Sequence, residues 1–136
     1  MKSILIAAIA TLSVAGPVLA DGDAAEGEAQ FKKCKACHAI IADDGTEIQK
    51  GGKTGPNLYG VIGRAVASAD FKYSADMVAA GESGLVWDEV EVAAFITDPS
   101  AWVKEKTGND GAKSKMTFKL KDDQDDLAAY LASVVQ

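Results

Sequence analysis

The chain has 136 residues, of which 48% are hydrophobic and 25% charged, and its formal net charge is −6. This length and composition suit one small globular domain. The acidic balance disfavours a nucleic-acid-binding role, because proteins of that class present basic surfaces.

Residues 1–20 have the pattern of a secretory signal peptide. Lys2 gives a short charged start, residues 4–14 form an apolar run, and the small residue Ala20 precedes Asp21. A membrane anchor is the weaker alternative, because the run is short for a bilayer and has no stop-transfer flank. We therefore expect cleavage after Ala20, export to a bacterial periplasm, and a mature domain over residues 21–136 without stable membrane insertion. That domain has 13 basic and 20 acidic residues, a net charge of −7.

A first helix is predicted over residues 23–35. Glu26 near its start and Lys33 near its end carry the charges that the helix dipole favours at those positions. Gly27 and Phe31 are four residues apart and share one face, where the glycine would let another helix approach closely.

The five residues from Cys34 to His38 contain both cysteines and the only histidine of the chain. The pattern Cys-x-x-Cys-His is that of covalent haem attachment. Two thiols three residues apart on a helical turn can each add to one vinyl group of a single porphyrin. The following residue then offers a neutral imidazole to the iron.

Three other interpretations of this motif are weaker. A thioredoxin-like Cys-x-x-Cys needs a βαβ context, which the surrounding sequence lacks. A structural zinc site needs four ligands, and the chain offers only three Cys and His side chains. A disulfide between Cys34 and Cys37 is the remaining alternative, but it leaves His38 without a role.

The middle of the chain is predicted to be mostly irregular. Residues 42–54 are polar and glycine-rich, which predicts a loop. Residues 54–64 have neither helical nor strand period, which indicates rigid backbone suited to lining a cofactor. Aromatic side chains alternate in an extended piece over residues 71–74, and a short helix is expected over residues 74–80.

The C-terminal third is predicted to hold two helices separated by a loop. The first spans residues 87–97, ends before Pro99, and would bury Val90, Ala93, Ala94 and Ile96. A polar loop containing Gly108 and Gly111 would follow over residues 104–113. The last helix, over residues 122–135, has an apolar stripe at helical spacing: Leu127, Tyr130, Leu131 and Val134. No strand is expected, so the predicted architecture is all-α, with long loops around one haem.

A second axial ligand to the iron would have to be a methionine, since the chain has no second histidine. Met116 lies in a short non-helical stretch that could cross the open face of a haem, and Met77 lies in the candidate helix near residues expected to line it. Either side chain could instead only fill the core. The residues by themselves leave this choice open.

The chain resembles the class I c-type cytochromes, the group that includes mitochondrial cytochrome c and the bacterial cytochromes c2 and c550. The resemblance extends over nearly the whole mature chain and combines several motifs in the same order. These motifs are Cys34 to His38, residues 54–60, Gly63-Arg64, residues 71–73, Trp87, Asp98-Pro99, residues 115–118 and residues 126–131.

The resemblance implies a small cytochrome c fold and a set of residue roles. His38 and Met116 would be the axial ligands of one haem c, attached through thioethers to Cys34 and Cys37. The carbonyl of Pro56 would accept a hydrogen bond from His38. The haem propionates would be held by Arg64, Tyr73, Trp87 and Ser114, and Phe118 would shield the exposed haem edge.

Two departures from the mitochondrial protein stand out. The loop over residues 104–113 is longer, so its course is not given by the resemblance. Phe95 stands where the mitochondrial protein has a tyrosine near the methionine sulfur.

The resemblance implies a soluble, monomeric electron carrier and not an enzyme. Its partners would be membrane redox complexes: a bc-type complex as donor, and an oxidase, a reaction centre or a nitrogen-oxide reductase as acceptor. These would dock at a lysine-lined haem edge made of Lys32, Lys33, Lys35, Lys113, Lys115, Lys119 and Lys121. A haem enzyme would need an open iron site with an acid or base above it, and a sensor would need an output domain.

Overall fold

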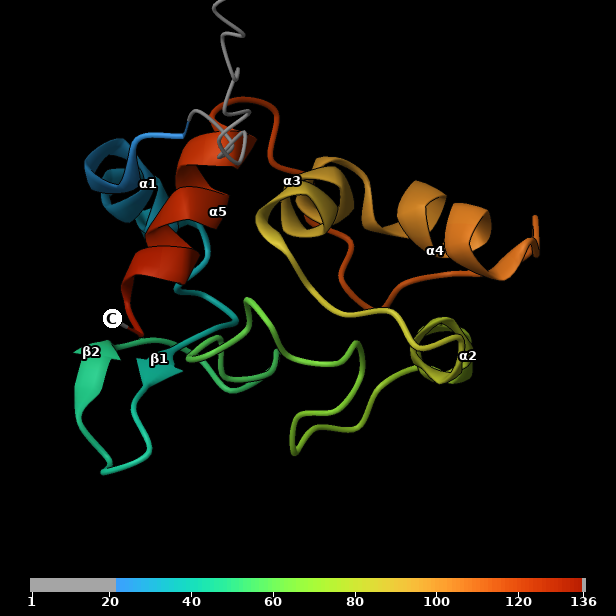
Figure 1. Cartoon of the computed structure of the whole chain (residues 1–136), viewed down its shortest axis with the longest axis horizontal. Helices are drawn as coiled ribbons and strands as arrows, with labels where there is room; N and C mark the ends of the chain where they lie inside the picture. The colour runs from blue at the N-terminus through green and yellow to red at the C-terminus, as the bar shows by residue number, and fades with distance from the viewer. Residues whose placement is uncertain (1–21, 136) are drawn as a thin grey trace, which may run out of the picture.

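The computed structural model describes residues 22–135 (Figure 1). The proposed signal peptide, residues 1–20, lies outside the described residues. Within them the chain forms five α-helices, a short 3-10 helix and one two-stranded sheet. The helices surround a buried apolar cluster, and long irregular segments connect them, so the expected all-α architecture is confirmed.

The first helix, α1 (Ala24–Gln30), is shorter than expected because its last turn tightens into the 3-10 helix η1 (Phe31–Lys33). The Asp23 side chain caps α1 by accepting hydrogen bonds from the backbone N–H groups of Ala25 and Glu26. Helix α1 lies against α5 (Gln124–Ser133), the last helix, as Figure 1 shows. The two ends of the domain are therefore packed together.

The expectation of no strand was wrong. Strands β1 (Ile40–Ile41) and β2 (Glu47–Gln49) pair antiparallel, and β2 lies within the segment predicted to be a loop. The pairing is short and irregular in register, so it leaves little periodicity in the sequence. Ile40 joins the sheet to the buried core, and Gln49 donates a hydrogen bond to the Tyr130 hydroxyl of α5 at 2.8 Å.

Helix α2 (Ala75–Glu82) begins after Ser74, whose hydroxyl accepts from the backbone N–H of Met77. Helix α3 (Glu89–Thr97) begins two residues later than predicted, after the capping residue Asp88. The predicted buried face of α3 was only half right. Ala93 and Ile96 are buried, but Val92 is buried in place of Val90, which is 66% exposed, and Ala94 is exposed.

Helix α4 (Pro99–Thr107) corrects the first part of the polar loop predicted over residues 104–113, whereas residues 108–113 are non-helical as expected. Pro99 does not only stop the preceding helix: it occupies the first turn of α4, where its missing N–H costs nothing. Asp98 makes the change of direction possible, because its side chain accepts from the backbone N–H of Ala101 and so caps the new helix. The helix ends at Gly108, which adopts the left-handed conformation common after helices.

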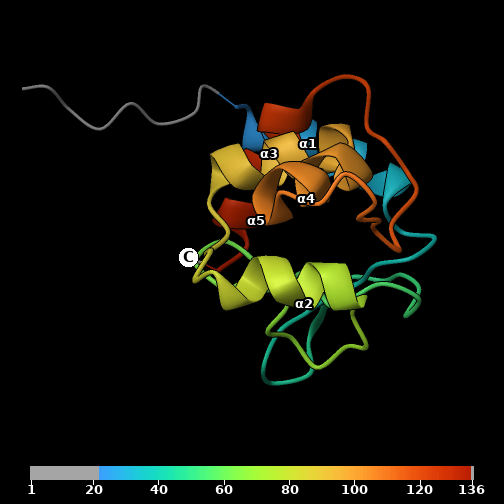
Figure 2. The same cartoon turned by 90° about the vertical axis from the view of Figure 1, so that its right-hand side faces the viewer.

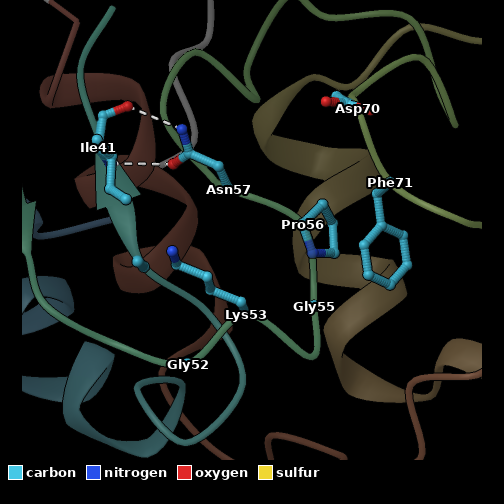
Figure 3. Close-up of a pocket in the computed structure, with 9 residues that line it drawn as sticks. Ile41, Gly52, Lys53, Gly55, Pro56, Asn57, Asp70 and Phe71 are labelled. Atoms are coloured by element: carbon cyan, nitrogen blue, oxygen red, sulfur yellow. Dashed lines mark hydrogen bonds between the residues drawn. The ribbon is translucent and has the colours of Figure 1, made fainter. Parts of the chain in front are cut away.

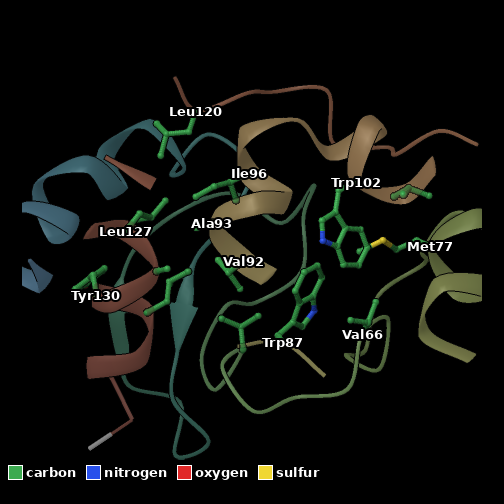
Figure 4. Packing of buried hydrophobic residues seen from close by; sticks show 14 of the residues in the cluster. Val66, Met77, Trp87, Val92, Ala93, Ile96, Trp102, Leu120, Leu127 and Tyr130 are labelled. Atoms are coloured by element: carbon green, nitrogen blue, oxygen red, sulfur yellow. The ribbon is translucent and has the colours of Figure 1, made fainter. Parts of the chain in front are cut away.

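The core lies between these layers. Figure 2 shows α2 running below the layer formed by α3 and α4, and Figure 4 shows the buried side chains between them. The predicted apolar stripe of α5 faces inward, with Leu127, Tyr130 and Leu131 buried and Val134 partly buried. Among residues 22–135, no helix has the length and apolar character needed to cross a membrane.

Candidate haem-binding site

A cavity of about 370 Å³ opens between the turn after η1, the irregular segment that follows β2, and helices α2, α3 and α5. Its walls are mostly apolar, and they include Leu58, Val61, Val92, Ile96, Leu127 and Leu131. A large planar apolar cofactor fits a cavity of this kind, because burial of its surface would replace missing core. Every residue that the sequence suggested for haem binding lines this one cavity.

Cys34, Cys37 and His38 are brought to the cavity by a single helical turn. The backbone N–H groups of Cys37 and His38 both donate to the carbonyl of Cys34, at 3.1 and 2.9 Å. Both cysteines are free thiols in this structure. Burial raises the pKa of Cys34 to about 11, while the nearby Lys33 charge lowers it, so this thiol is neutral at pH 7.

The imidazole of His38 is held in one orientation. It is only 9% exposed, and its Nδ1 donates to the carbonyl oxygen of Pro56 at 2.8 Å. Because a carbonyl only accepts, this bond requires the proton on Nδ1 and leaves the Nε2 lone pair free to bind a metal. Burial lowers the pKa of His38, and the bond to Pro56 opposes that effect without cancelling it. The ring is therefore neutral at pH 7.

The segment that carries Pro56 fits closely over the histidine. A Cβ atom on Gly55 would lie 2.3 Å from His38 Cε1, and one on Gly51 would lie 1.8 Å from the His38 carbonyl oxygen. The side-chain amide of Asn57 fixes the segment from the other side by bonding to both the N–H and the carbonyl of Ile41, as Figure 3 shows. A second cavity of about 220 Å³ shares Gly55, Pro56 and Phe71 with the first.

Both candidate methionines line the large cavity, but in different ways. Met77 is buried in α2 and belongs to the same hydrophobic cluster as Trp102 (Figure 4). Met116 is half-buried on the irregular segment after α4, where its backbone N–H donates to the Ser114 hydroxyl at 3.1 Å. Met77 thus belongs to the core cluster, whereas Met116 is only partly buried and packs against that cluster from an irregular segment.

The polar residues expected at the propionates also reach the cavity. The Arg64 guanidinium donates to the carbonyls of Asn57 and Tyr59, which fixes its position and uses part of its five N–H donors. Burial raises the pKa of Tyr73, while the nearby Arg64 charge lowers it. The two side chains therefore place a cation beside a neutral hydroxyl at the cavity wall, an arrangement suited to a carboxylate.

Three more of the residues suggested for the site have distinct positions. Trp87 is 7% exposed and forms part of the cavity wall. Ser114 lines the cavity and anchors its segment by a backbone N–H bond to Ser100 at 3.3 Å. Phe118 is 44% exposed, so its ring sits at the rim of the cavity and not in its interior.

Several residues of the cavity wall were not assigned to haem binding from the sequence. Val92 and Ile96 are four apart on α3, and Leu127 and Leu131 are four apart on α5. Both pairs have the spacing of one helical face, but in a sequence that spacing marks core and cofactor contacts alike. Phe71, Lys33 and Lys115 also line the cavity.

The structure does not support the alternative of a structural zinc site. Within residues 22–135, no three His, Cys, Asp or Glu side chains gather in a way that could hold a metal ion directly. The two thiols, the imidazole and the thioether instead meet around a cavity sized for an organic group. This donor set and this apolar cradle define a protein that binds haem.

Comparison with known proteins identifies the family. The sequence model described as cytochrome c matches residues 24–134, and the chain belongs to the cytochrome c family. The cytochrome c-551 of Roseobacter denitrificans is 52% identical over 134 residues, which are 98% of this chain and 96% of that protein. The cytochrome c2 of Rhodobacter capsulatus is 53% identical over 135 residues, 98% of each chain.

Solved structures agree with the fold. The structure of cytochrome c2 from Rhodobacter capsulatus superposes with a TM-score of 0.83 at 56% identity and covers 85% of this chain and 100% of that one. Ferric cytochrome c-550 from Paracoccus versutus gives a TM-score of 0.80 at 54% identity, over 82% and 97% of the two chains. The family carries one covalently bound haem c, and Cys34 and Cys37 have the spacing of that attachment. The protein therefore carries haem c and serves in electron transfer.

Proposed function

We propose that this protein is a periplasmic one-electron carrier that shuttles between membrane redox complexes and is not an enzyme. The observation that carries the proposal is the convergence of residues 34–38 and Met116 on one apolar cavity. These segments are about 80 residues apart in the sequence. Such a cavity would offer two protein ligands to one metal ion and would leave little water around it.

Cys34 and Cys37 would form the thioethers to one haem c, and His38 and Met116 would be its axial ligands. The bound haem would supply a reversible Fe(III)/Fe(II) couple. The Pro56 carbonyl supports His38 in this role, because the bond to Nδ1 fixes the ring and makes Nε2 more basic. The soft Met116 thioether would favour the reduced state and raise the potential.

The remaining site residues would hold the cofactor and control its exposure. Arg64, Tyr73 and Trp87 would donate hydrogen bonds to the propionates, with Ser114 as a further donor. Phe118, at the rim, would limit solvent access to the haem edge. If His38 and Met116 both bind the iron, no coordination site would stay open for a substrate, which would favour electron transfer over catalysis.

The docking surface would be the lysine-lined edge. All seven lysines proposed for it are exposed, and two of them, Lys33 and Lys115, line the cavity itself. A bc-type complex would be the donor, and an oxidase, a reaction centre or a nitrogen-oxide reductase the acceptor.

Rapid mixing with purified complexes tests this function. We expect the bc-type complex to reduce the oxidised protein, and at least one acceptor complex to reoxidise the reduced protein. Both rates should rise with protein concentration. The proposal is wrong if none of these complexes exchanges electrons with the protein while the protein itself consumes peroxide rapidly.

Location and attachment are tested on the exported protein. The intact mass of the periplasmic fraction should equal residues 21–136 plus one haem. Haem that acidified organic solvent extracts, or a mass that retains residues 1–20, would contradict this part of the proposal.

A further inference from the structure

Two tryptophans stack at the cavity wall, one in the wall and one behind it. The rings of Trp87 and Trp102 have centroids 4.9 Å apart and planes inclined by 25°. Trp87 lines the haem cavity. Trp102 comes from α4, is 4% exposed, and does not line the cavity, but packs against Trp87 (Figure 4). Any constraint on the Trp102 ring is therefore passed to Trp87.

One carboxylate fixes the Trp102 ring. The indole Nε1 donates to Glu91 Oε2 at 2.7 Å, and the Lys106 ammonium donates to Glu91 Oε1 at 2.8 Å. The same ammonium lies 5.7 Å from the centroid of the Trp102 ring. Hydrogen bonds to charged groups are shorter and stronger than neutral ones, so this arrangement holds the indole firmly. The bond to Glu91 also raises the pKa of Lys106, which keeps it charged.

A third ring completes the packing. Phe95 lies one helical turn after Glu91 on α3 and meets both tryptophans edge-on, with centroids 5.2 Å from Trp87 and 5.3 Å from Trp102. Phe95 also lines the cavity. Phe95 therefore holds the two tryptophan rings from the cavity side, and the Glu91 carboxylate holds the Trp102 ring from the other side.

We propose that Glu91 is a positioning residue that acts through Trp102 to fix the Trp87 indole in the wall of the haem cavity. This rests on the proposed function in one respect, the role of Trp87 as a hydrogen-bond donor to a propionate. A tilted Trp87 would donate less well, the propionate charge would be less neutralised, and the oxidised state of the iron would be favoured.

The test compares three variants of the holoprotein. Glu91→Ala removes the acceptor for the Trp102 N–H, Glu91→Gln removes the charge but keeps a carbonyl acceptor, and Glu105→Ala is the matched control. Glu105 is the right control because it also pairs with Lys106, at 3.4 Å, but is not the acceptor for Trp102. Two quantities are measured: the exchange rate of the Trp87 indole proton by NMR in the reduced protein, and the ratio of reduced to oxidised protein at one applied potential.

In Glu91→Ala we expect the Trp87 indole proton to exchange about tenfold faster or more, and the redox ratio to move at least about threefold towards the oxidised form. Each tenfold change in that ratio corresponds to about 59 mV for one electron. Glu91→Gln should restore most of both values, and Glu105→Ala should change neither. Equal redox shifts in Glu91→Ala and Glu91→Gln would overturn the proposal, because the effect would then be one of charge alone.

A fourth variant separates this proposal from the role assigned to Trp87. If Trp87→Phe leaves the redox ratio unchanged, the proposed propionate contact is wrong. The exchange rates of the Trp87 indole proton in the Glu91 variants then test by themselves whether Glu91 positions Trp87. If Trp87→Phe shifts the ratio while Glu91→Ala changes neither quantity, Trp87 keeps its role and the positioning by Glu91 is refuted.

Discussion

His38 illustrates how a single side chain is prepared for its role by its neighbours. Burial keeps its imidazole neutral, and the Pro56 carbonyl selects the tautomer with the lone pair on Nε2. Gly55 permits the approach, because a Cβ there would collide with the ring. Packing and one hydrogen bond thus orient the histidine without any contribution from a metal ion.

The choice between the two methionines is tested by removing each. Met116→Ala should abolish the iron–sulfur charge-transfer band of the oxidised protein, lower the midpoint potential and permit peroxidase activity, because a coordination site opens. Met77→Ala is the matched control and should keep the band while costing about 2–5 kcal/mol of stability, as a core truncation does. Optical spectra of the two oxidised variants decide the matter. Loss of the band in Met77→Ala alone would reverse the assignment.

Phe95 allows a test of tuning by a single hydroxyl. In mitochondrial cytochrome c, which this chain resembles, a tyrosine at this position donates a hydrogen bond towards the methionine sulfur. Such a bond draws electron density from sulfur, and Fe(III) needs that density more than Fe(II) does. Phe95→Tyr should therefore raise the midpoint potential by a few tens of millivolts, on the order of other tuning contacts near metal ligands.

The matched control is Phe71→Tyr, which adds the same hydroxyl to another phenylalanine of the cavity wall. Its potential should stay near that of the natural protein. Potentiometric titration of both variants at one pH and ionic strength gives the comparison. A potential that falls or stays level in Phe95→Tyr would show that the hydroxyl does not serve the sulfur here.

At the scale of elements, the crossing of α1 and α5 depends on one missing side chain. A Cβ on Gly27 would lie 1.9 Å from the carbonyl oxygen of Asp126 and 2.8 Å from the Tyr130 Cβ. The backbone of α5 passes directly over this glycine. Beside it, the rings of Phe31 and Tyr130 pack with centroids 6.0 Å apart. At Gly27, the backbone of α1 therefore packs directly against the backbone of α5.

Gly27→Ala tests this crossing, because we expect it to destabilise the protein although alanine normally stabilises a helix relative to glycine. Within a helix, alanine is normally more stable than glycine by about 0.5–1 kcal/mol. Here the clash should outweigh that gain and lower the free energy of unfolding by about 1–3 kcal/mol. Urea denaturation of the holoprotein measures this free energy of unfolding. Ala29→Gly, at an exposed site of the same helix, gives the size of the helix-propensity effect, and a more stable Gly27→Ala would contradict the close crossing.

On the scale of the whole molecule, charge is segregated although the net charge is negative. The seven lysines of the proposed docking edge come from residues 32–35 and 113–121, which contain no acidic residue. Acidic side chains gather instead where α1 and α5 begin, as with Asp23, Asp125 and Asp126. Two docking lysines already have partners: Lys119 forms an ion pair with Asp98 at 2.6 Å, and Lys115 donates to the carbonyl of Lys72 at 2.7 Å.

This distribution predicts electrostatic steering towards an acidic partner surface. The second-order rate constant with an acceptor complex should fall as salt rises from about 0.01 M to about 0.1 M, because the screening length shortens from about 30 to about 10 Å. Lys33→Glu and Lys115→Glu should each slow the reaction at low salt. Lys50→Glu changes the net charge equally at an exposed site outside the cavity lining, so it should slow the reaction much less. A rate that is flat or rises with salt would contradict steering.

The sequence alone was sufficient where function depends on local spacing. Cys34, Cys37 and His38 are close in the sequence and lie on one helical turn, so their spacing predicts haem attachment, and the family comparison confirms the cofactor. The stripe on α5 was also predictable, because Leu127, Tyr130 and Leu131 recur with the period of a helix. These features need no knowledge of what lies across the core.

Only the tertiary structure decided features that depend on distant partners. Pro99 can end one helix or begin another, and it begins α4 because Asp98 caps the new helix and Trp102 finds Trp87 to pack against. Val92 is buried in place of Val90 for the same reason, since the cavity wall selects which face of α3 turns inward. The contact between Glu91 and Trp102 joins two helices whose relative angle no local pattern encodes. In each case a residue has two locally acceptable states, and long-range packing chooses between them.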